Sequence, residues 1–402
     1  MTAPPLPLKT MIVAGIMSGT SADGVDVALV RIGPRRRTGG SGEQNDLRVA
    51  LLSHTEVPFT AALRHAVLAA MDALSTSTAE LARLNWRLGI AYEEAVRAAI
   101  AAHPCRVDLI GCHGQTIYHQ AAPRVYAGRQ VACTWQIGEM APLAASMKVP
   151  VVSNFRPADM VAGGQGAPLV PLLDFVYFRH AGRGRVLQNI GGIANLAAIP
   201  AAAVLADVIA FDTGPGNMVI DAAMQELFNK PYDREGRMAA RGKVLPGVLA
   251  EALQHPFFKL LPPRSAGREQ FGAAFTTKFL KACAASSSSA HDAIATATAL
   301  TAHSIAAAYQ SFIRTRMGGA PVDYLLSGGG ARNLTLTAMV AELLAPMGCS
   351  VGSVDEAGLP AQAKEAVAFA LLAYQTLHGL PGNVPSATGA TRPAILGQIT
   401  HA

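Results

Sequence analysis

Residues 12–32 read IVAGIMSGTSADGVDVALVRI, and their pattern predicts the fold at the start of the chain. Two apolar segments, residues 12–17 and 25–32, flank a turn made of Ser, Thr, Gly, Ala and Asp. This pattern predicts two strands joined as an antiparallel hairpin. Glycine in such a turn lets backbone N–H groups approach an anion closely, so the turn is also a candidate phosphate site.

The rest of the chain predicts further strands and helices in alternation, which is typical of an α/β protein. In the first half, the apolar patterns predict strands at 47–57 and 107–111 and helices at 61–74 and 78–103. In the second half they predict strands at 185–190, 195–199, 208–211 and 322–326, a turn at 212–217, and helices at 218–228, 333–344 and 364–378. Because each half begins with a hairpin and a glycine turn, we expect a duplicated architecture.

Length and composition favour two lobes. With 402 residues, half of them hydrophobic, the chain can bury more than one core. We place the N-terminal lobe at residues 8–155, completed by the C-terminal tail 378–402, and the C-terminal lobe at residues 156–377.

Charge and cysteine content exclude several classes of protein. The net charge of +6 is spread along the chain, and its densest basic cluster, residues 35–37, lacks interleaved aromatic residues, which argues against nucleic-acid binding. Five cysteines without a Cys-x-x-Cys pair predict neither a disulfide framework nor a zinc site, and fit the reducing cytoplasm. No segment reads as a signal peptide or a membrane span.

Three glycine turns each follow a predicted strand: residues 17–21 (MSGTS), 189–192 (NIGG) and 327–330 (SGGG). Each could be a structural tight turn, but together they predict a nucleotide held between the two lobes. None matches the P-loop or the Rossmann fingerprint, which argues against those two kinds of nucleotide site.

Several polar side chains are candidates for chemistry. Asp212 ends a predicted buried strand in FDTGPGN, where a carboxylate can act as a general base, hold a magnesium-bound phosphate, or equally form an Asx-turn or helix cap. Asp23 and Asp26 follow the first turn, and each could either form a turn or helix cap or have a role with phosphate or magnesium. Arg156 and Asp159 lie in a glycine-rich segment that suits sugar recognition, although an inter-lobe loop is the alternative.

The chain resembles the anhydro-N-acetylmuramic acid kinases, within the actin/sugar kinase/Hsp70 fold group. The matching segments follow the family's order across nearly the whole chain. They are GIMSGTSADGVD (15–26), HGQT (113–116), QIGE (136–139), FRPADMVAGGQGAPLVP (155–171), NIGGIANL (189–196), FDTGPGNMVID (211–221), SAGREQF (265–271), SGGGARN (327–333) and residues 381–396.

The resemblance implies two RNase H-like domains with a central nucleotide cleft, and a reaction that uses ATP and Mg²⁺. Water opens the ring of 1,6-anhydro-N-acetylmuramic acid at C1 while O6 is phosphorylated, which yields N-acetylmuramic acid 6-phosphate and ADP in peptidoglycan recycling. The resemblance also implies a homodimer with a small sugar substrate. It gives no assignment of metal ligands.

The resemblance further implies roles for individual residues. Asp212 would be the general base, and Glu365 would help to hold the attacking water. Gln115, Thr116, Arg156 and Asp159 would face the sugar. The residues expected to bind ATP are Gly19, Thr20, Ser21, Ala22, Asp23, Gly24, Val25, Asp26, Asn189, Gly191, Gly192, Gly328, Gly329 and Gly330.

One departure from the family pattern concerns Ala266. The family usually has Lys-Ser-Thr-Gly-Arg where this chain has RSAGR at residues 264–268, so a threonine hydroxyl and its hydrogen bond are missing. Two other functions stay as alternatives. One is a kinase of an ordinary hexosamine such as N-acetylglucosamine, and the other is a nucleotide-regulated binding protein of the actin/Hsp70 kind.

Overall fold

The chain divides into two compact units. The computed structural model describes residues 7–35, 46–71 and 73–402. The first unit comprises residues 1–177 and 362–402, and the second comprises residues 178–361. Residues 156–177 and 362–377, which the sequence placed in the C-terminal lobe, therefore pack with the first unit. Residues 36 and 37 of the predicted basic cluster lie outside the described part of the chain.

The first unit is built on a six-stranded mixed sheet in the order β13-β7-β4-β1-β2-β3. The predicted hairpin is confirmed, because β1 pairs antiparallel with β2 from Met11↔Ile32 to Met17↔Asp26. β4 runs parallel to β1, and β7 runs parallel to β4. The strands are β1 (Met11–Met17), β2 (Gly24–Pro34), β3 (Leu47–Pro58), β4 (Leu109–Cys112), β7 (Val151–Ser153) and β13 (Gln398–Thr400).

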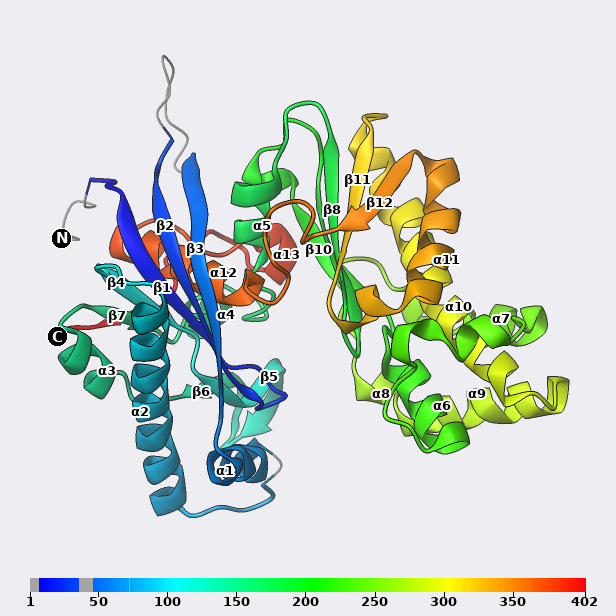
Figure 1. Ribbon diagram of the computed structural model, residues 1–402, viewed down its shortest axis with the longest axis horizontal. Helices are drawn as coiled ribbons and strands as arrows, with labels where there is room; N and C mark the ends of the chain where they lie inside the picture. Colours follow the sequence, from blue (N-terminus) through cyan, green and yellow to red (C-terminus); the bar gives the residue numbers. More distant parts are fainter. Residues whose placement is uncertain (1–6, 36–45, 72) are drawn as a thin grey trace. The chain divides into compact units, whose positions relative to one another are not determined.

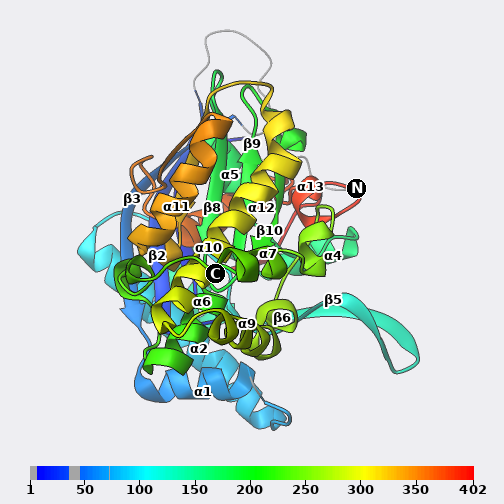
Figure 2. The same cartoon turned by 90° about the vertical axis from the view of Figure 1, so that its right-hand side faces the viewer.

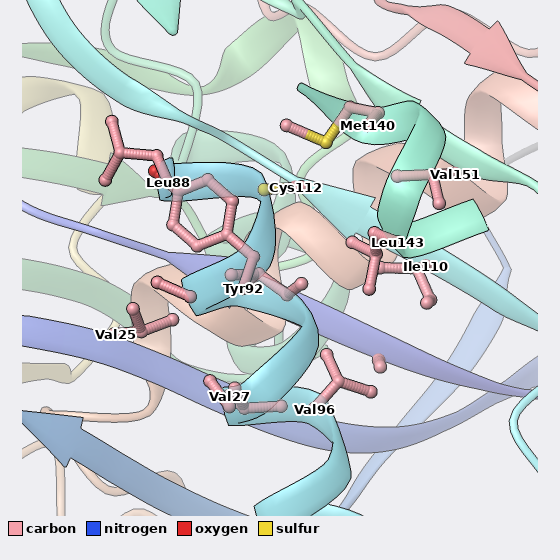
Figure 3. Close-up of a cluster of buried hydrophobic side chains, with 14 of the residues drawn as sticks. Val25, Val27, Leu88, Tyr92, Val96, Ile110, Cys112, Met140, Leu143 and Val151 are labelled. Atoms are coloured by element: carbon pink, nitrogen blue, oxygen red, sulfur yellow. The ribbon is translucent and has the colours of Figure 1, made fainter. Parts of the chain in front are cut away.

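Helices cover both faces of this sheet (Figure 1). On one face, α2 (Thr78–Ala102) and α3 (Met140–Met147) pack with β2 and β4 around the buried Tyr92, as Figure 3 shows. On the other face, α12 (Lys364–Leu377) lies directly against Gly15 and Gly111, where a Cβ atom would collide with the helix backbone. The remaining helices of this unit are α1 (Ala61–Met71), α4 (Arg156–Val161), α5 (Pro171–Phe178) and α13 (Pro385–Thr388).

A second, separate sheet of the first unit was not predicted. It consists of β5 (Gln115–Tyr126) and β6 (Arg129–Ile137), which pair antiparallel. Figure 2 shows this hairpin extending away from the rest of its unit. Most of its side chains are exposed, so its sequence lacks the alternation of polar and apolar residues by which a half-buried strand is recognised.

The second unit repeats the topology of the first. Its sheet has the order β10-β9-β8-β11-β12, with β8, β9 and β10 antiparallel and β8, β11 and β12 parallel. Strands β1, β2, β3, β4 and β7 thus correspond to β8, β9, β10, β11 and β12, which confirms the predicted duplication and the α/β class. The strands are β8 (Gly184–Ile190), β9 (Ala194–Ile199), β10 (Ile209–Gly214), β11 (Val322–Ser327) and β12 (Cys349–Ser353).

Two apolar cores hold the second unit together. Helices α10 (Ala290–Ala308) and α11 (Leu334–Leu344) pack on one face of the sheet around the buried Tyr309 and Tyr324. A helical cluster forms the second core from α10 and its neighbours α6 (Met218–Phe228), α7 (Pro246–Ala252), α8 (Arg268–Phe271) and α9 (Ala273–Ser286). Within the described residues, no helix is both long and apolar enough to cross a membrane.

Candidate active site

Three turns of the second unit meet at one end of its sheet. The turn after β8 contacts the turn after β10, because the Asn217 N–H donates to the carbonyl of Gly191 at 2.8 Å. Gly216 has φ +53° and lies so close to this carbonyl that a Cβ atom would collide with it. Gly328, after β11, packs in the same way against the backbone at Ile190. Two of the three predicted glycine turns thus form one surface, at which an anion can approach backbone N–H groups.

The helix α6 begins directly at this surface. The Met218 N–H donates to the carbonyl of Gly192 at 3.0 Å, so the first residue of the helix contacts the β8 turn. A helix N-terminus carries a partial positive charge. The glycine surface and this helix end together suit a phosphate group.

Asp212 lies in β10 at a bulge in the pairing with β9, two residues before the end of the strand that leads into the glycine surface. Its Oδ2 accepts a hydrogen bond of 2.7 Å from the backbone N–H of Ala266. Desolvation raises the pKa of this carboxyl to about 6, although the Ala266 N–H and the positive charge of Arg264 act in the opposite direction. A half-buried carboxylate with such a pKa is still ionised at neutral pH and is a better proton acceptor than a free aspartate. The strand continues through Gly214, so the predicted turn at 212–217 begins three residues later than expected.

The first predicted phosphate turn lies in the first unit, between β1 and β2. Gly19, Thr20 and Ser21 form its accessible part, whereas Ala22 and Val25 point into the apolar core. Only the backbone of these two core residues is therefore free to meet a ligand.

The buried Gln115 holds this turn in place. Its Nε2 donates to the carbonyl of Gly19 at 3.2 Å, and its Oε1 accepts a hydrogen bond from Ser18. With both ends of its amide used by the protein, Gln115 supports the turn, and this geometry favours a positioning role over the predicted contact with a sugar. Thr116 is partly exposed, and its hydroxyl accepts a hydrogen bond of 3.3 Å from Gln136.

One group of side chains in the described part of the chain could hold a metal ion. The ligand atoms of Asp26, His54 and Glu56 all lie within 4.8 Å of one another. His54 Nε2 is 2.8 Å from Asp26 Oδ1. Magnesium prefers oxygen ligands and keeps several waters, so the carboxylate of Asp26 fits Mg²⁺, whereas the imidazole of His54 is better suited to zinc.

The cationic Arg156 side chain is hydrogen-bonded to the neutral side chain of His113, the residue that follows β4. Arg156 Nε donates to His113 Nε2 at 3.0 Å, while His113 Nδ1 donates to the carbonyl of Gly114 at 2.8 Å. Burial and the charge of Arg156 lower the pKa of His113 to about 3, so the histidine stays neutral and accepts from the arginine. Arg156 Nη1 also donates to the carbonyl of Gly166, which ties it to the glycine-rich loop.

Glu365 lies in the first turn of α12. Its side chain keeps an exposed surface, but protein surrounds it closely enough for desolvation to raise its pKa. Arg156 and Lys364 lower this pKa, and Asp26 raises it, so these four charged groups influence one another within the first unit. Lys364 is anchored by the buried Asp174, with 2.7 Å between Nζ and Oδ1.

Asp159 is completely buried, and protein donors occupy both of its oxygens. Oδ2 accepts from the N–H of Gly166 at 2.8 Å, and Oδ1 accepts from Asn383 at 2.8 Å and Thr388 at 2.7 Å. These contacts join the glycine-rich loop to the C-terminal tail. They favour a structural role for Asp159 over the predicted contact with a sugar.

Sequence reasoning missed the residues that support the candidate base Asp212, and it missed the partner of Lys364. Arg264 and Ala266 contact Asp212 from more than fifty positions away in the chain, and Asp174 reaches Lys364 across the second unit's entire sequence. No local pattern marks such pairs. The resemblance did single out the RSAGR segment, but as a departure and not as a support for Asp212.

Known proteins resemble this chain in sequence over nearly its full length and, more distantly, in structure. Among solved structures, the activator of the 2-hydroxyisocaproyl-CoA dehydratase from Clostridium difficile with bound ADPNP has a TM-score of 0.41 and 11% identity, covering 91% of this chain and 96% of that chain. The family model described as anhydro-N-acetylmuramic acid kinase matches residues 11–402. A relative of that name from Bacillus cereus (strain AH187) is 43% identical over 97% of this chain and 99% of its own length. Another, from Bacillus cereus (strain B4264), is 45% identical over 97% of both.

Proposed function

This chain belongs to the anhydro-N-acetylmuramic acid kinase family, and we propose that it phosphorylates O6 of 1,6-anhydro-N-acetylmuramic acid with ATP while water opens the anhydro ring at C1. The products are N-acetylmuramic acid 6-phosphate and ADP. The observation that carries this proposal is the Asp212 carboxylate, which has a raised pKa and lies near the end of the strand that leads into a glycine surface suited to phosphate. This pairing provides what the reaction needs, a proton acceptor next to the phosphoryl donor.

Asp212 acts as the general base in this proposal. It takes a proton from water as the water oxygen forms a bond to C1 of the sugar. The C1–O6 bond breaks, O6 attacks the γ-phosphorus of ATP, and the bond from that phosphorus to the β–γ bridging oxygen breaks to release ADP. The hydrogen bond from the Ala266 N–H to Oδ2 sets the direction of the carboxylate.

The glycine turns bind the nucleotide. Backbone N–H groups at Gly191, Gly192 and Gly328 to Gly330 of the second unit are suited to donate to the phosphates of ATP. The turn at Gly19 to Ser21 of the first unit, taken by itself, offers backbone N–H groups suited to the same kind of contact. Asp26 is the carboxylate suited to hold magnesium together with phosphate oxygens and water. The magnesium ion, when bound, neutralises charge that develops on the phosphates.

Arg156, Thr116 and Glu365 serve the sugar in this proposal. The substrate carries a carboxylate, which a guanidinium group can bind through two hydrogen bonds. Glu365 has a raised pKa and an exposed surface, which suits a group that holds a water molecule. Gln115 and Asp159 act without contacting the sugar. Gln115 holds the turn between β1 and β2, and Asp159 holds the glycine-rich loop.

We place this activity in peptidoglycan recycling and amino-sugar metabolism, in the cytoplasm. All five cysteines are free, which fits a reducing compartment. The enzyme acts as a homodimer, and the support for this comes from the β5–β6 hairpin. Tyr118, Val125, Tyr126 and Trp135 on this hairpin are each at least half exposed. A two-stranded hairpin is only marginally stable alone, so a second copy would stabilise it.

An assay of ADP release tests the proposed function. The enzyme is supplied with ATP, Mg²⁺ and one of three sugars: 1,6-anhydro-N-acetylmuramic acid, N-acetylmuramic acid or N-acetylglucosamine. Turnover on the anhydro sugar alone is expected. Activity on the open-ring sugars only would indicate an ordinary hexosamine kinase, and ATP hydrolysis that does not depend on sugar would indicate a nucleotide-regulated binding protein.

A further inference from the structure

Arg264 is a buried cation that contacts several backbone carbonyls and aromatic rings. It is only 6% exposed. Its Nη1 donates to three carbonyl oxygens, those of Phe257, Phe258 and Leu260, at 3.0 to 3.4 Å. Its Nε donates to the backbone carbonyl of Asp212 at 3.0 Å. A guanidinium group suits this task because its donors are fixed in a planar fork.

Three aromatic rings surround the same guanidinium. Its Cζ lies 4.7 Å from the ring centre of Phe257, 5.1 Å from that of Phe312 and 5.4 Å from that of Phe211. These distances are within the range of cation–π attraction. The rings come from β10, from residues 256–259 and from the segment that follows α10, so Arg264 joins three parts of the second unit.

The segment that carries Arg264 also pairs with β10 at Asp212. β10 is an edge strand of its sheet, with β9 on one side. On the other side, the Asp212 N–H donates to the carbonyl of Arg264 at 3.0 Å, and Arg264 Nε returns a bond to the Asp212 carbonyl. Two residues later, the Ala266 N–H donates to Oδ2 of Asp212. Backbone and carboxylate of Asp212 are therefore held by the same short segment.

We propose that Arg264 is the positioning residue of the candidate base: it locks residues 264–266 onto β10 so that the Ala266 N–H keeps the Asp212 carboxylate in its working direction. This inference rests on the proposed role of Asp212 as the base. A loose segment would let the carboxylate rotate, and a displacement of about 1 Å at a reacting group can lower the rate about 100-fold. Among the described residues, Arg264 is also the charged group that acts on the pKa of Asp212.

Variants at Arg264 separate positioning from simple folding. Arg264→Gln removes the charge, Arg264→Met removes charge and donors, and Arg264→Lys keeps the charge. Arg183→Met is the control, because it removes another arginine of the second unit, one that is only partly buried and whose Nε contacts Asp323 at 3.0 Å and not Asp212. Unfolding temperature, kcat and the KM values for ATP and sugar are measured for each.

We expect Arg264→Gln and Arg264→Met to lower kcat about 100-fold with little change in either KM. Arg264→Lys should recover most of this loss, and Arg183→Met should lower the unfolding temperature while leaving kcat unchanged. If Arg264→Met fails to fold, Arg264→Gln carries the test. A folded Arg264→Gln enzyme whose kcat is within about threefold of the wild type would overturn the proposal.

A second measurement does not depend on turnover. The titration of Asp212 is followed by carboxyl ¹³C NMR, with the signal assigned from its loss in Asp212→Asn. In Arg264→Gln the positive charge is lost and the Ala266 N–H is no longer held against the carboxylate, so the pKa of Asp212 should rise further. In Arg183→Met the pKa of Asp212 should not change. If the pKa of Asp212 does not change in Arg264→Gln, the positioning role is contradicted, even if the wild-type enzyme acts on another sugar. If the pKa changes but the wild-type enzyme is inactive, only the proposed function is contradicted.

Discussion

Asp212 and Asp159 were both predicted to act at the active site, yet the two units place them in opposite environments. Asp159 is completely buried, and three protein donors satisfy its two oxygens. Asp212 is partly exposed, receives one N–H from Ala266, and has a pKa raised to about 6. A carboxylate whose oxygens are all satisfied stabilises the fold, whereas a desolvated carboxylate that keeps access to solvent is available for proton transfer.

The largest expected effect tests Asp212 itself. Asp212→Asn keeps the volume of the side chain but removes the proton acceptor, so kcat should fall about 1,000-fold or more. ATP binding, measured by calorimetry, should remain within a few-fold of the wild type. A variant with nearly normal turnover would show that Asp212 is not the base, and the comparison with Asp159 would then lose its basis.

The matching substitution at Asp159 should affect stability and not the chemical step. In Asp159→Asn the carboxylate becomes an amide. Its NH₂ group would then face one of the protein donors that now bind the carboxylate, so that two hydrogen-bond donors would oppose each other. The loss should be about 2 kcal/mol, with a fall in unfolding temperature of about 5 °C. The folded fraction should keep a kcat near that of the wild type. A large fall in kcat without loss of stability would restore the predicted contact between Asp159 and the sugar.

The stability of the fold should depend on pH through the Asp212 carboxyl. The pKa of Asp212 is raised from 3.8 to about 6, so between these pH values the folded chain binds a proton that the unfolded chain has released. Stability from this group therefore falls as the pH rises from about 4 to 6, and the full cost is present above pH 6. Asp212→Asn removes this cost and should raise the unfolding temperature near pH 7.5 but not near pH 4.

A control for that measurement is available in α6. Asp221 also has a pKa raised to about 6 by desolvation, so Asp221→Asn should change stability with pH in the same direction. Calorimetric scans of both variants at the two pH values check the prediction. A lower unfolding temperature for Asp212→Asn near pH 7.5 would mean that its ionised form is stabilised by the fold, contrary to the raised pKa.

The smallest expected effect concerns Ala266, where the family usually has threonine. The contact with Asp212 uses the backbone N–H of this residue, which any side chain other than proline retains. Ala266→Thr should therefore change kcat less than about threefold. A gain of tenfold or more in steady-state assays would show that the missing hydroxyl contributes to the reaction after all.

Local sequence patterns were enough to predict the frame that carries these carboxylates. The hairpin of residues 12–32, the helix beginning at Thr78 and the helix beginning at Lys364 lie within a few residues of their predicted bounds. The helix beginning at Thr78 buries one apolar face, which leaves a periodic trace in the sequence, whereas β1 and the helix beginning at Lys364 are buried almost throughout and appear as apolar runs. The two sheets share one topology, as the paired glycine turns had suggested.

The environment of each candidate residue could not be predicted in the same way. Asp159 is satisfied by Asn383 and Thr388, and Asp212 is held by Arg264 and Ala266, all of them distant in the chain. Neither contact has a local period or spacing. The β5–β6 hairpin was missed for a related reason, because its exposed strands bury too little apolar surface to show alternation.

The most direct test of the account is the fate of the water oxygen. The reaction is run briefly in oxygen-18 water with ATP and the anhydro sugar, and the products are analysed by mass spectrometry, with unlabelled product incubated alongside to correct for exchange at C1. We predict one labelled oxygen on C1 of N-acetylmuramic acid 6-phosphate and none in its phosphate group. Label in free inorganic phosphate, with the sugar ring intact, would mean that water attacks ATP and would contradict the account.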